Sequence, residues 1–245
     1  MMSLFEKKKK NQKSSRKLQI VASPEAPFSY VEAYKSLRTN LKFIANTSGA
    51  RSFVITSAVP EESKSNTAIN LAITLAMDGQ NVVLVDCDLR KPVLHKYMKG
   101  ARGRKGLTNV LAGEVELESC IAKFKDVNIN ALVAGTIPPN PSELLSSQAM
   151  ADVIEQLKDH FDYVILDAPP VSVVTDAAIL GNLVDGAIFV IRSKYAPLDA
   201  VKLAKQKLDE VGVKIFGTVI TRYDAKNSNK RTGYSYSYGY EYYKE

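Results

Sequence analysis

Short, uniformly apolar segments of β-type residues recur along this chain, and longer segments with helical spacing separate them. Strands this apolar need cover on both faces, which is the condition of a parallel sheet between two layers of helices. The order predicts an α/β fold, a doubly wound, mostly parallel sheet whose ligand crevice lies at the carboxyl ends of the strands. The apolar segments are 52–58, 81–86, 129–135, 162–169, 186–192 and 213–221.

Apolar side chains recur every three or four residues in 27–44, which predicts a helix with one buried face. Further helices are predicted at 64–78, 142–159, 175–184 and 197–211. With 245 residues, 45% of them hydrophobic, the chain is long enough for one large domain. We expect a basic flexible arm (1–27), one folded α/β domain (28–222) and a flexible tyrosine-rich tail (223–245).

The net charge of +7 owes much to the start of the chain. Such a run is typical of a solvated arm, and the alternative is attraction to an anionic membrane surface. Nucleic acid is not expected as a partner, because no recognition-helix or zinc pattern accompanies the charge. Two cysteines make no disulfide framework, which favours the cytoplasm. The basic residues are Lys7, Lys8, Lys9, Lys10, Lys13, Arg16 and Lys17.

The first apolar segment leads into V-P-E-E-S-K-S-N-T, residues 59–67. Lys64 and Ser65 between a strand and a helix indicate a phosphate-binding loop, in which Lys neutralises phosphate charge and Ser ligates Mg²⁺. Ser63 stands where such loops carry Gly, and two carboxylates at 61 and 62 would lie beside a polyanion. An ordinary strand-to-helix turn with a Ser N-cap is the alternative.

Carboxylates follow two of the apolar segments: Asp86 and Asp88 after one, Asp167 after the other. Parallel strands bring their carboxyl ends to one edge of a sheet, where the phosphate loop also lies. One such Asp is commonly a turn residue, but three beside a Lys-Ser loop predict a magnesium–nucleotide site.

These motifs together resemble the bacterial tyrosine kinases of the P-loop type, cytoplasmic enzymes of capsule and exopolysaccharide production. Lys64-Ser65 matches their Walker A loop, 86–90 (D-C-D-L-R) matches their D-x-D-x-R motif, and Asp167 followed by Pro169-Pro170 matches Walker B. The loop departs from the family's P-G-E-G-K-S at Glu61 and Ser63. The resemblance covers residues 28–222 and extends to the tail.

The resemblance implies ATP and Mg²⁺ as cofactors and assigns roles to the residues. Asp88 would orient a tyrosine hydroxyl and accept its proton, and Arg90 would steady the transferring charge or brace the loop. Ser65, Asp86 and Asp167 would hold Mg²⁺. The Lys64 side chain and the backbone N–H groups of the loop would hold the phosphates. The loop residues are Glu61, Glu62, Ser63, Lys64, Ser65, Asn66 and Thr67.

Six of the twelve tyrosines lie in the last thirteen residues. In the resembling family such a cluster is phosphorylated in trans; a low-complexity tail without enzymatic purpose is the alternative. The phosphoacceptors would be Tyr234, Tyr236, Tyr238, Tyr240, Tyr242 and Tyr243.

The resemblance also implies partners. Glu32, Lys35 and Arg38 match the family's E-x-x-R-x-x-R helix of ring-shaped homo-oligomers, with Lys35 in place of Arg. A transmembrane polysaccharide co-polymerase would activate the kinase at the inner face of the cell membrane, and a cognate tyrosine phosphatase would oppose it.

Two other functions stay open. A P-loop ATPase of the partitioning or positioning type commonly carries a second lysine early in its loop, and residues 57–63 contain none. A nucleotide-binding regulator with weakened catalysis is compatible with Glu61 and Ser63.

Overall fold

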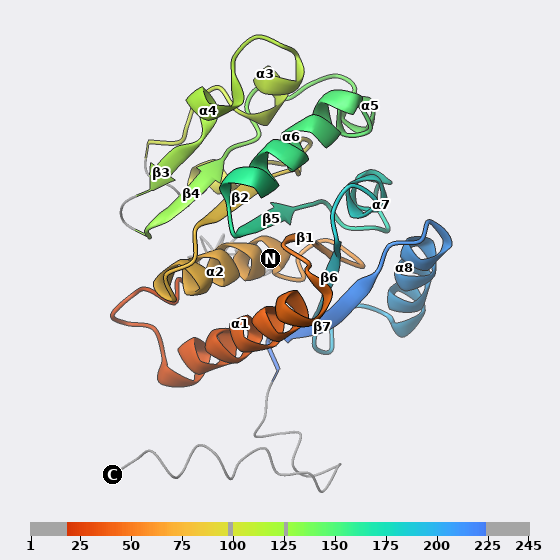
Figure 1. Cartoon of the computed structure of the whole chain (residues 1–245). Coiled ribbons are helices and arrows are strands. Elements are labelled where there is room, and N and C mark those ends of the chain that lie inside the picture. The colour runs from red at the N-terminus through yellow and green to blue at the C-terminus, as the bar shows by residue number, and fades with distance from the viewer. Residues whose placement is uncertain (1–18, 98–99, 125–126, 224–245) are drawn as a thin grey trace, which may run out of the picture.

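One sheet organises the molecule (Figure 1). The computed structural model describes residues 19–97, 100–124 and 127–223. The strand order is β3-β4-β2-β5-β1-β6-β7, and every pairing is parallel except that of β3 with β4. The strands are β1 (Ser52–Ser57), β2 (Val82–Asp86), β3 (Ala122–Phe124), β4 (Ile129–Leu132), β5 (Tyr163–Asp167), β6 (Gly186–Arg192) and β7 (Ile215–Thr221).

Helices cover both faces of the sheet. The pair α1 and α2 lies on one face, and α6, α7 and α8 lie on the other (Figure 1). The helices are α1 (Phe28–Ser48), α2 (Lys64–Met77), α3 (Leu107–Leu111), α4 (Leu117–Cys120), α5 (Pro141–Leu145), α6 (Gln148–His160), α7 (Asp176–Gly181) and α8 (Leu198–Glu210), with a 3₁₀ turn η1 (Leu94–Lys96). No helix in the described part of the chain combines the length and apolar character needed to cross a bilayer.

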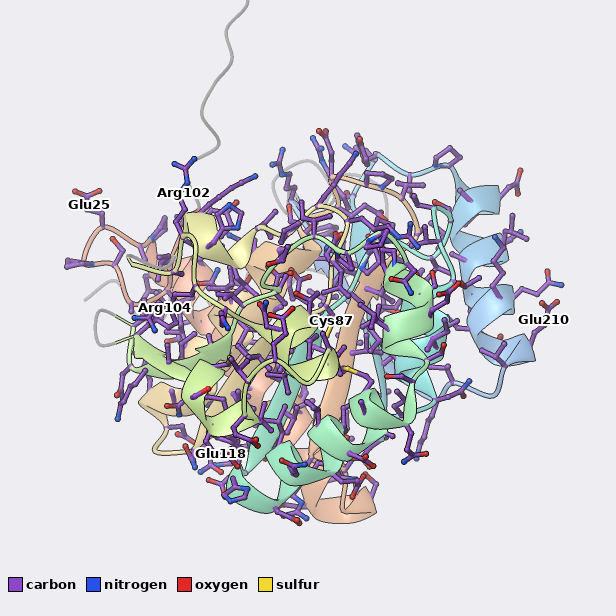
Figure 2. The ribbon with its side chains drawn as sticks, turned by 90° about the horizontal axis from the view of Figure 1, so that it is seen from above. Glu25, Cys87, Arg102, Arg104, Glu118 and Glu210 are labelled. Carbon is purple, nitrogen blue, oxygen red and sulfur yellow. The ribbon has the colours of Figure 1, made fainter. Side chains whose placement is uncertain are left out.

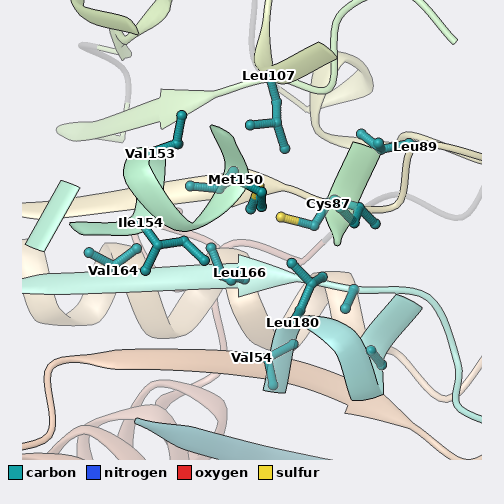
Figure 3. Close-up of a cluster of buried hydrophobic side chains, with 14 of the residues drawn as sticks. Val54, Cys87, Leu89, Leu107, Met150, Val153, Ile154, Val164, Leu166 and Leu180 are labelled. Carbon is teal, nitrogen blue, oxygen red and sulfur yellow. The ribbon is translucent and has the colours of Figure 1, made fainter. Parts of the chain in front are cut away.

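Two buried clusters lie on the two faces of the sheet. Along β2, Val83 and Val85 pack into the cluster shared with α6 and α7, while Val82 and Leu84 pack into the cluster shared with α2. Cys87 continues the first series, and its side chain points into the cluster that contains Met150 (Figure 3). Because side chains alternate along a strand, the residues between these positions face α2.

The predicted doubly wound, mostly parallel sheet is confirmed, and each predicted apolar segment contains a strand. The single helix predicted over 142–159 is wrong, because α5 and α6 replace it. Ser147 lies between them in an extended conformation (φ −72, ψ 157). Its Oγ donates to the carbonyl of Leu144 (2.7 Å) and accepts from the N–H of Met150 (3.3 Å). The apolar spacing continues across both helices, so the sequence pattern did not predict the helix boundary at Ser147.

The first described residues pack against α2. Val21 is buried and its N–H donates to Asn70 Oδ1 (2.8 Å), so this end of the predicted arm contacts the domain. The α1 stripe buries Tyr34 and Leu41, and Gly49 ends the helix at φ 72, a left-handed conformation that glycine adopts readily. The basic residues at 7–17 and the tail from 224 lie outside the described residues.

Replacing Ser147 with Ala should lower the free energy of unfolding by about 1 kcal/mol, because α6 loses its N-cap acceptor. Urea denaturation followed by circular dichroism measures the change. Ser146→Ala is the control: its exposed hydroxyl donates to the carbonyl of Glu143, and its effect should stay within about 0.5 kcal/mol. Equal effects from both variants would contradict the capping role.

Candidate active site

The register of the sheet places two carboxylates side by side. Asp86 ends β2, Asp167 ends β5, and the two are direct partners across the parallel pair. Both are completely buried. They alternate with Val85 and Leu166, which face the opposite cluster, so they point toward the start of α2.

Lys64, the first residue of α2, supplies the positive charge. Its Nζ lies 3.2 Å from Asp88 Oδ2, 3.3 Å from Asp167 Oδ1 and 3.3 Å from Ser65 Oγ. Burial opposes the ammonium charge, but Asp167 and Asp88 outweigh it and raise the pKa of Lys64. The sequence prediction that one lysine and these carboxylates meet at the sheet edge agrees with this geometry.

Asp86 has one oxygen bound and one free. Its Oδ2 accepts the N–H groups of Val93 and Leu94, each at 3.0 Å. Its Oδ1 and Asp167 Oδ2 are buried without a hydrogen-bond partner within the described structure. Burial, followed by the charge of Asp167, raises the pKa of Asp86 to about 7. Burial also raises the pKa of Asp167, and the charge of Lys64 opposes that rise.

Two unpartnered carboxylate oxygens fit a divalent cation. Within the described ranges no three carboxylate, imidazole or thiol groups gather to cage a metal. Mg²⁺ does not need such a cage, because it is usually held by one or two carboxylates together with hydroxyl, phosphate and water oxygens. Asp86, Asp167 and the neighbouring Ser65 hydroxyl offer this donor set.

The backbone of the phosphate loop adopts a conformation that favours glycine at two positions. Glu61 and Ser63 have φ values of 69 and 72, a left-handed conformation that costs an ordinary residue roughly 1–2 kcal/mol. Both are positions at which P-G-E-G-K-S has Gly. The loop therefore keeps its shape with two residues that do not favour it, so other contacts hold it.

Glu62 provides those contacts. It is fully buried, and its two carboxylate oxygens accept the N–H groups of Val59 (2.9 Å) and Arg192 (3.0 Å). Its carbonyl accepts the hydroxyl of Thr221 (2.9 Å). The carboxylate of Glu62 is thus turned into the protein and held there by these two N–H groups. Sequence patterns gave no sign that Glu62 ties the loop to the ends of β6 and β7.

Similarity to known proteins agrees with this geometry. The chain matches the AAA domain family over residues 62–212. It is 36% identical over 228 residues to tyrosine-protein kinase YwqD of Bacillus subtilis, covering 93% of this chain and 94% of that protein. The chain belongs to the bacterial tyrosine kinases. The kinase domain of Escherichia coli tyrosine kinase ETK has a TM-score of 0.75 at 36% identity, over 86% of this chain and 81% of that one.

The fold extends beyond the bacterial tyrosine kinases. The septum site-determining protein MinD of Pyrococcus horikoshii, in complex with Mg-ADP, has a TM-score of 0.61 at 25% identity, over 71% of this chain and 70% of that one. A magnesium nucleotide is thus a ligand of proteins with this fold. The higher identity and coverage of the two kinases separate this chain from the positioning ATPases.

Other predicted residues of the kinase are held by protein contacts. Arg90 Nε donates to Asp176 Oδ2 (3.0 Å) and its NH2 group donates to Ser142 Oγ (2.7 Å). Asp176 is fully buried at the start of α7. These contacts brace the segment after β2 against α5 and α7. Asp88 uses its second oxygen to accept the N–H of Lys91 (3.0 Å).

The first turn of α2 contacts α1. Asn66 Oδ1 accepts the hydroxyls of Tyr30 (2.9 Å) and Tyr34 (3.1 Å), and burial raises the pKa of both tyrosines. Thr67 Oγ1 donates to the carbonyl of Ser63 (3.1 Å). Helical spacing predicts the two tyrosines as apolar stripe residues, so their hydroxyl contacts beside the phosphate loop were missed.

The predicted oligomer residues lie along α1. Lys35 pairs with Glu32 (2.7 Å) one turn away. Arg38 pairs with Asp78 (3.3 Å) and donates to the carbonyl of Thr74 (3.2 Å), so it also joins α1 to α2. The six predicted phosphoacceptor tyrosines lie outside the described residues.

Replacing Glu62 with Gln should lower the free energy of unfolding by about 2 kcal/mol. The Gln carbonyl can accept one of the two N–H groups, and its NH₂ group faces the other, which becomes an unsatisfied buried donor. Thermal or urea unfolding measures the loss. Glu118→Gln, at an exposed position of α4, is the control and should change stability by less than about 0.5 kcal/mol; equal losses would remove the special role of Glu62.

Replacing Asp86 with Asn should stabilise the metal-free kinase at pH 8 by about 2 kcal/mol. The raised pKa means that Asp86 of the folded chain takes up a proton between the ordinary aspartate pKa of 3.8 and a pKa of about 7. Wild-type stability therefore rises as pH falls through that window, while Asn carries no charge to relieve.

Urea unfolding in EDTA at pH 8 and pH 5 measures this effect, and the advantage of Asp86→Asn should shrink at the lower pH. Asp159→Asn, at an exposed position of α6, is the control and should show no comparable change. A gain for Asp86→Asn that stayed equal at the two pH values would show that charge burial is not its cause.

Proposed function

We propose that this chain is an ATP-dependent protein-tyrosine kinase that phosphorylates the tyrosine cluster of another copy of itself. The observation that carries the proposal is the position of the Lys64 ammonium, within 3.3 Å of both Asp88 and Asp167 at the carboxyl edge of the sheet. Membership of the bacterial tyrosine kinases supports phosphoryl transfer to a phenol as the reaction. The acceptors would be Tyr234, Tyr236, Tyr238, Tyr240, Tyr242 and Tyr243.

Phosphoryl transfer asks a protein mainly to position groups and neutralise charge. Lys64 would exchange its carboxylate partners for phosphate oxygens, with the backbone N–H groups of 61–67 around them. Ser65, Asp86 and Asp167 would hold Mg²⁺, which when bound neutralises charge on the phosphates.

Asp88 would act on the incoming tyrosine. A phenol with a pKa near ~10 arrives protonated at neutral pH, so its oxygen gains a bond to the γ-phosphorus while its proton passes to Asp88 and ADP leaves. The side chain of Asp88 is 10% exposed, and the oxygen that contacts Lys64 would take the proton while the other keeps the N–H of Lys91. Arg90, fixed by Asp176, would hold the segment that carries Asp88.

The wider setting is part of the same proposal. A ring of copies joined through α1 would bring one chain's tail to its neighbour's site, with Glu32, Lys35 and Arg38 at the contact. Activation by a transmembrane polysaccharide co-polymerase would place the kinase at the inner face of the membrane, in capsule or exopolysaccharide synthesis, opposed by a cognate phosphatase.

The left-handed backbone of Glu61 and Ser63 favours one second candidate, a nucleotide-binding regulator with weakened catalysis. Strain in the loop would loosen phosphate binding without removing the fold.

A mixing experiment tests transfer between chains. Lys64→Met keeps its tail but loses the phosphate-binding ammonium, and a second chain with Phe at all six tail tyrosines keeps its site but loses the acceptors. With Mg-ATP, phosphotyrosine should appear on the Lys64→Met chain only when the two are mixed, with at least about a hundredfold drop in either chain alone.

Lys202→Met, on α8, is the control and should phosphorylate its own population like wild type. ATP hydrolysis without phosphotyrosine would support a positioning ATPase instead. ATP binding with neither product would support the regulator.

A further inference from the structure

A run of positive charge follows the D-x-D-x-R motif. Between residues 89 and 113 the chain has seven Lys or Arg residues and no Asp or Glu. We call residues 91–97 and 100–105 the basic segment. Lys91, Lys96, Arg102, Arg104 and Lys105 are exposed, and none of them has an ion pair within the described part of the chain.

Hydrogen bonds fix both ends of the basic segment at the active-site edge of the sheet. At its start the N–H of Lys91 donates to Asp88 Oδ1, and the N–H groups of Val93 and Leu94 donate to Asp86 Oδ2. Just after its end, the N–H of Leu107 donates to the carbonyl of Val133 (2.8 Å), which follows β4. Since β4 is the neighbour of β2, the segment starts in contact with Asp88 and ends at the adjacent strand of the same sheet edge.

The charges of the segment act on a common neighbourhood. The pKa of His95 is lowered, first by burial and then by the charges of Lys96 and Arg102, so both cations act on the same imidazole. Arg104 Nε donates to the carbonyl of Gly100 (2.8 Å), which folds the loop on itself. Arg102 and Arg104 project outward on one side of the molecule, away from the buried Cys87 (Figure 2).

Exposed cations on a segment that starts at the candidate active site fit an anionic ligand. The last twelve residues of the chain carry only Glu241, Lys244 and Glu245 as charged side chains. The unmodified tail therefore has little negative charge with which to bind the basic segment. Each phosphotyrosine adds about 1.5 to 2 negative charges. The planar guanidinium of an arginine binds phosphate oxygens through two parallel hydrogen bonds. The complementarity therefore begins only after the first phosphorylation.

We propose that the basic segment is a phosphotyrosine-binding surface. It holds the partly phosphorylated tail of a second copy beside Asp88 while the next tyrosine of that tail reacts. Retention raises the effective concentration of the remaining tyrosines, so phosphorylation of one tail proceeds through several sites. This inference rests on the proposed function.

Peptide binding tests the surface without any catalysis. The probe is a fluorescent synthetic peptide of residues 233–245 with no phosphate, with one at Tyr238, or with three at Tyr236, Tyr238 and Tyr240. The protein is the full chain with Phe at its six tail tyrosines, which leaves the surface unoccupied by its own tail. Fluorescence anisotropy should show affinity rising with each phosphate, to at least about tenfold for three.

Variants assign the binding to these residues. Arg102→Gln, Arg104→Gln and Lys105→Gln together should weaken binding of the triply phosphorylated peptide about tenfold. Lys91→Gln with Lys96→Gln is a second variant that leaves the Arg104–Gly100 contact intact, and it should weaken binding in the same direction. The control removes three charges from α8, with Lys202→Gln, Lys205→Gln and Lys207→Gln, and should change affinity less than about twofold.

Three results would overturn the proposal. One is equal affinity for the phosphorylated and unphosphorylated peptides. Another is equal weakening by the α8 variant, which would show attraction to net charge alone. The third is undiminished peptide binding by the Arg102/Arg104/Lys105 variant together with its loss of binding to phosphatidylserine vesicles, which would assign the surface to membranes. A chain that binds the phosphopeptide yet makes no phosphotyrosine would refute the proposed function and the successive phosphorylation that rests on it, and would leave only the phosphotyrosine-binding surface.

Discussion

The ammonium of Lys64 between Asp88 and Asp167 is the interaction on which the rest of the site depends. Parallel pairing of β2 with β5 brings two fully buried carboxylates, Asp86 and Asp167, into direct register. Two such charges repel each other and are removed from water, and both effects favour the protonated form of each carboxyl group. Lys64 lowers that cost only in part, since the pKa values of both carboxyl groups stay raised. The site therefore retains an attraction for additional positive charge, which is the property a magnesium site requires.

The phosphate loop depends on a different compensation. Its backbone is left-handed at Glu61 and Ser63, where glycine would adopt the same conformation without a steric cost. The buried carboxylate of Glu62 holds the loop by accepting one N–H from within it and another from the end of β6. The loop shape is thus maintained by tertiary contacts at positions where local preference opposes it. The contacts of Glu62 also join the phosphate loop to the ends of β6 and β7.

Much of the fold and the centre of the site could be predicted from the sequence. Uniformly apolar segments predicted the strands, because a strand in a sheet covered on both faces carries apolar side chains on both of its sides. Because the carboxyl ends of parallel strands meet at one edge of the sheet, Lys64 was expected beside Asp88 and Asp167. The helix boundary at Ser147 could not be predicted, because the apolar spacing continues across it and only the hydroxyl contacts reveal the cap. Arg90 was predicted as a site residue, but its buried partner Asp176 lies 86 residues away in the chain, beyond any local pattern.

The sequence by itself determined the class of fold, the chemical identity of the groups at the sheet edge and the distribution of charge along the chain. These are properties of residue type and spacing, which local rules can read. Only the tertiary structure decided which carboxylate oxygens are paired and which are left without a partner, and that Glu62 turns inward. It also decided that the basic segment begins and ends at the same edge as Asp88. Each of these outcomes depends on the register between strands and on packing between distant segments, for which a linear pattern carries no information.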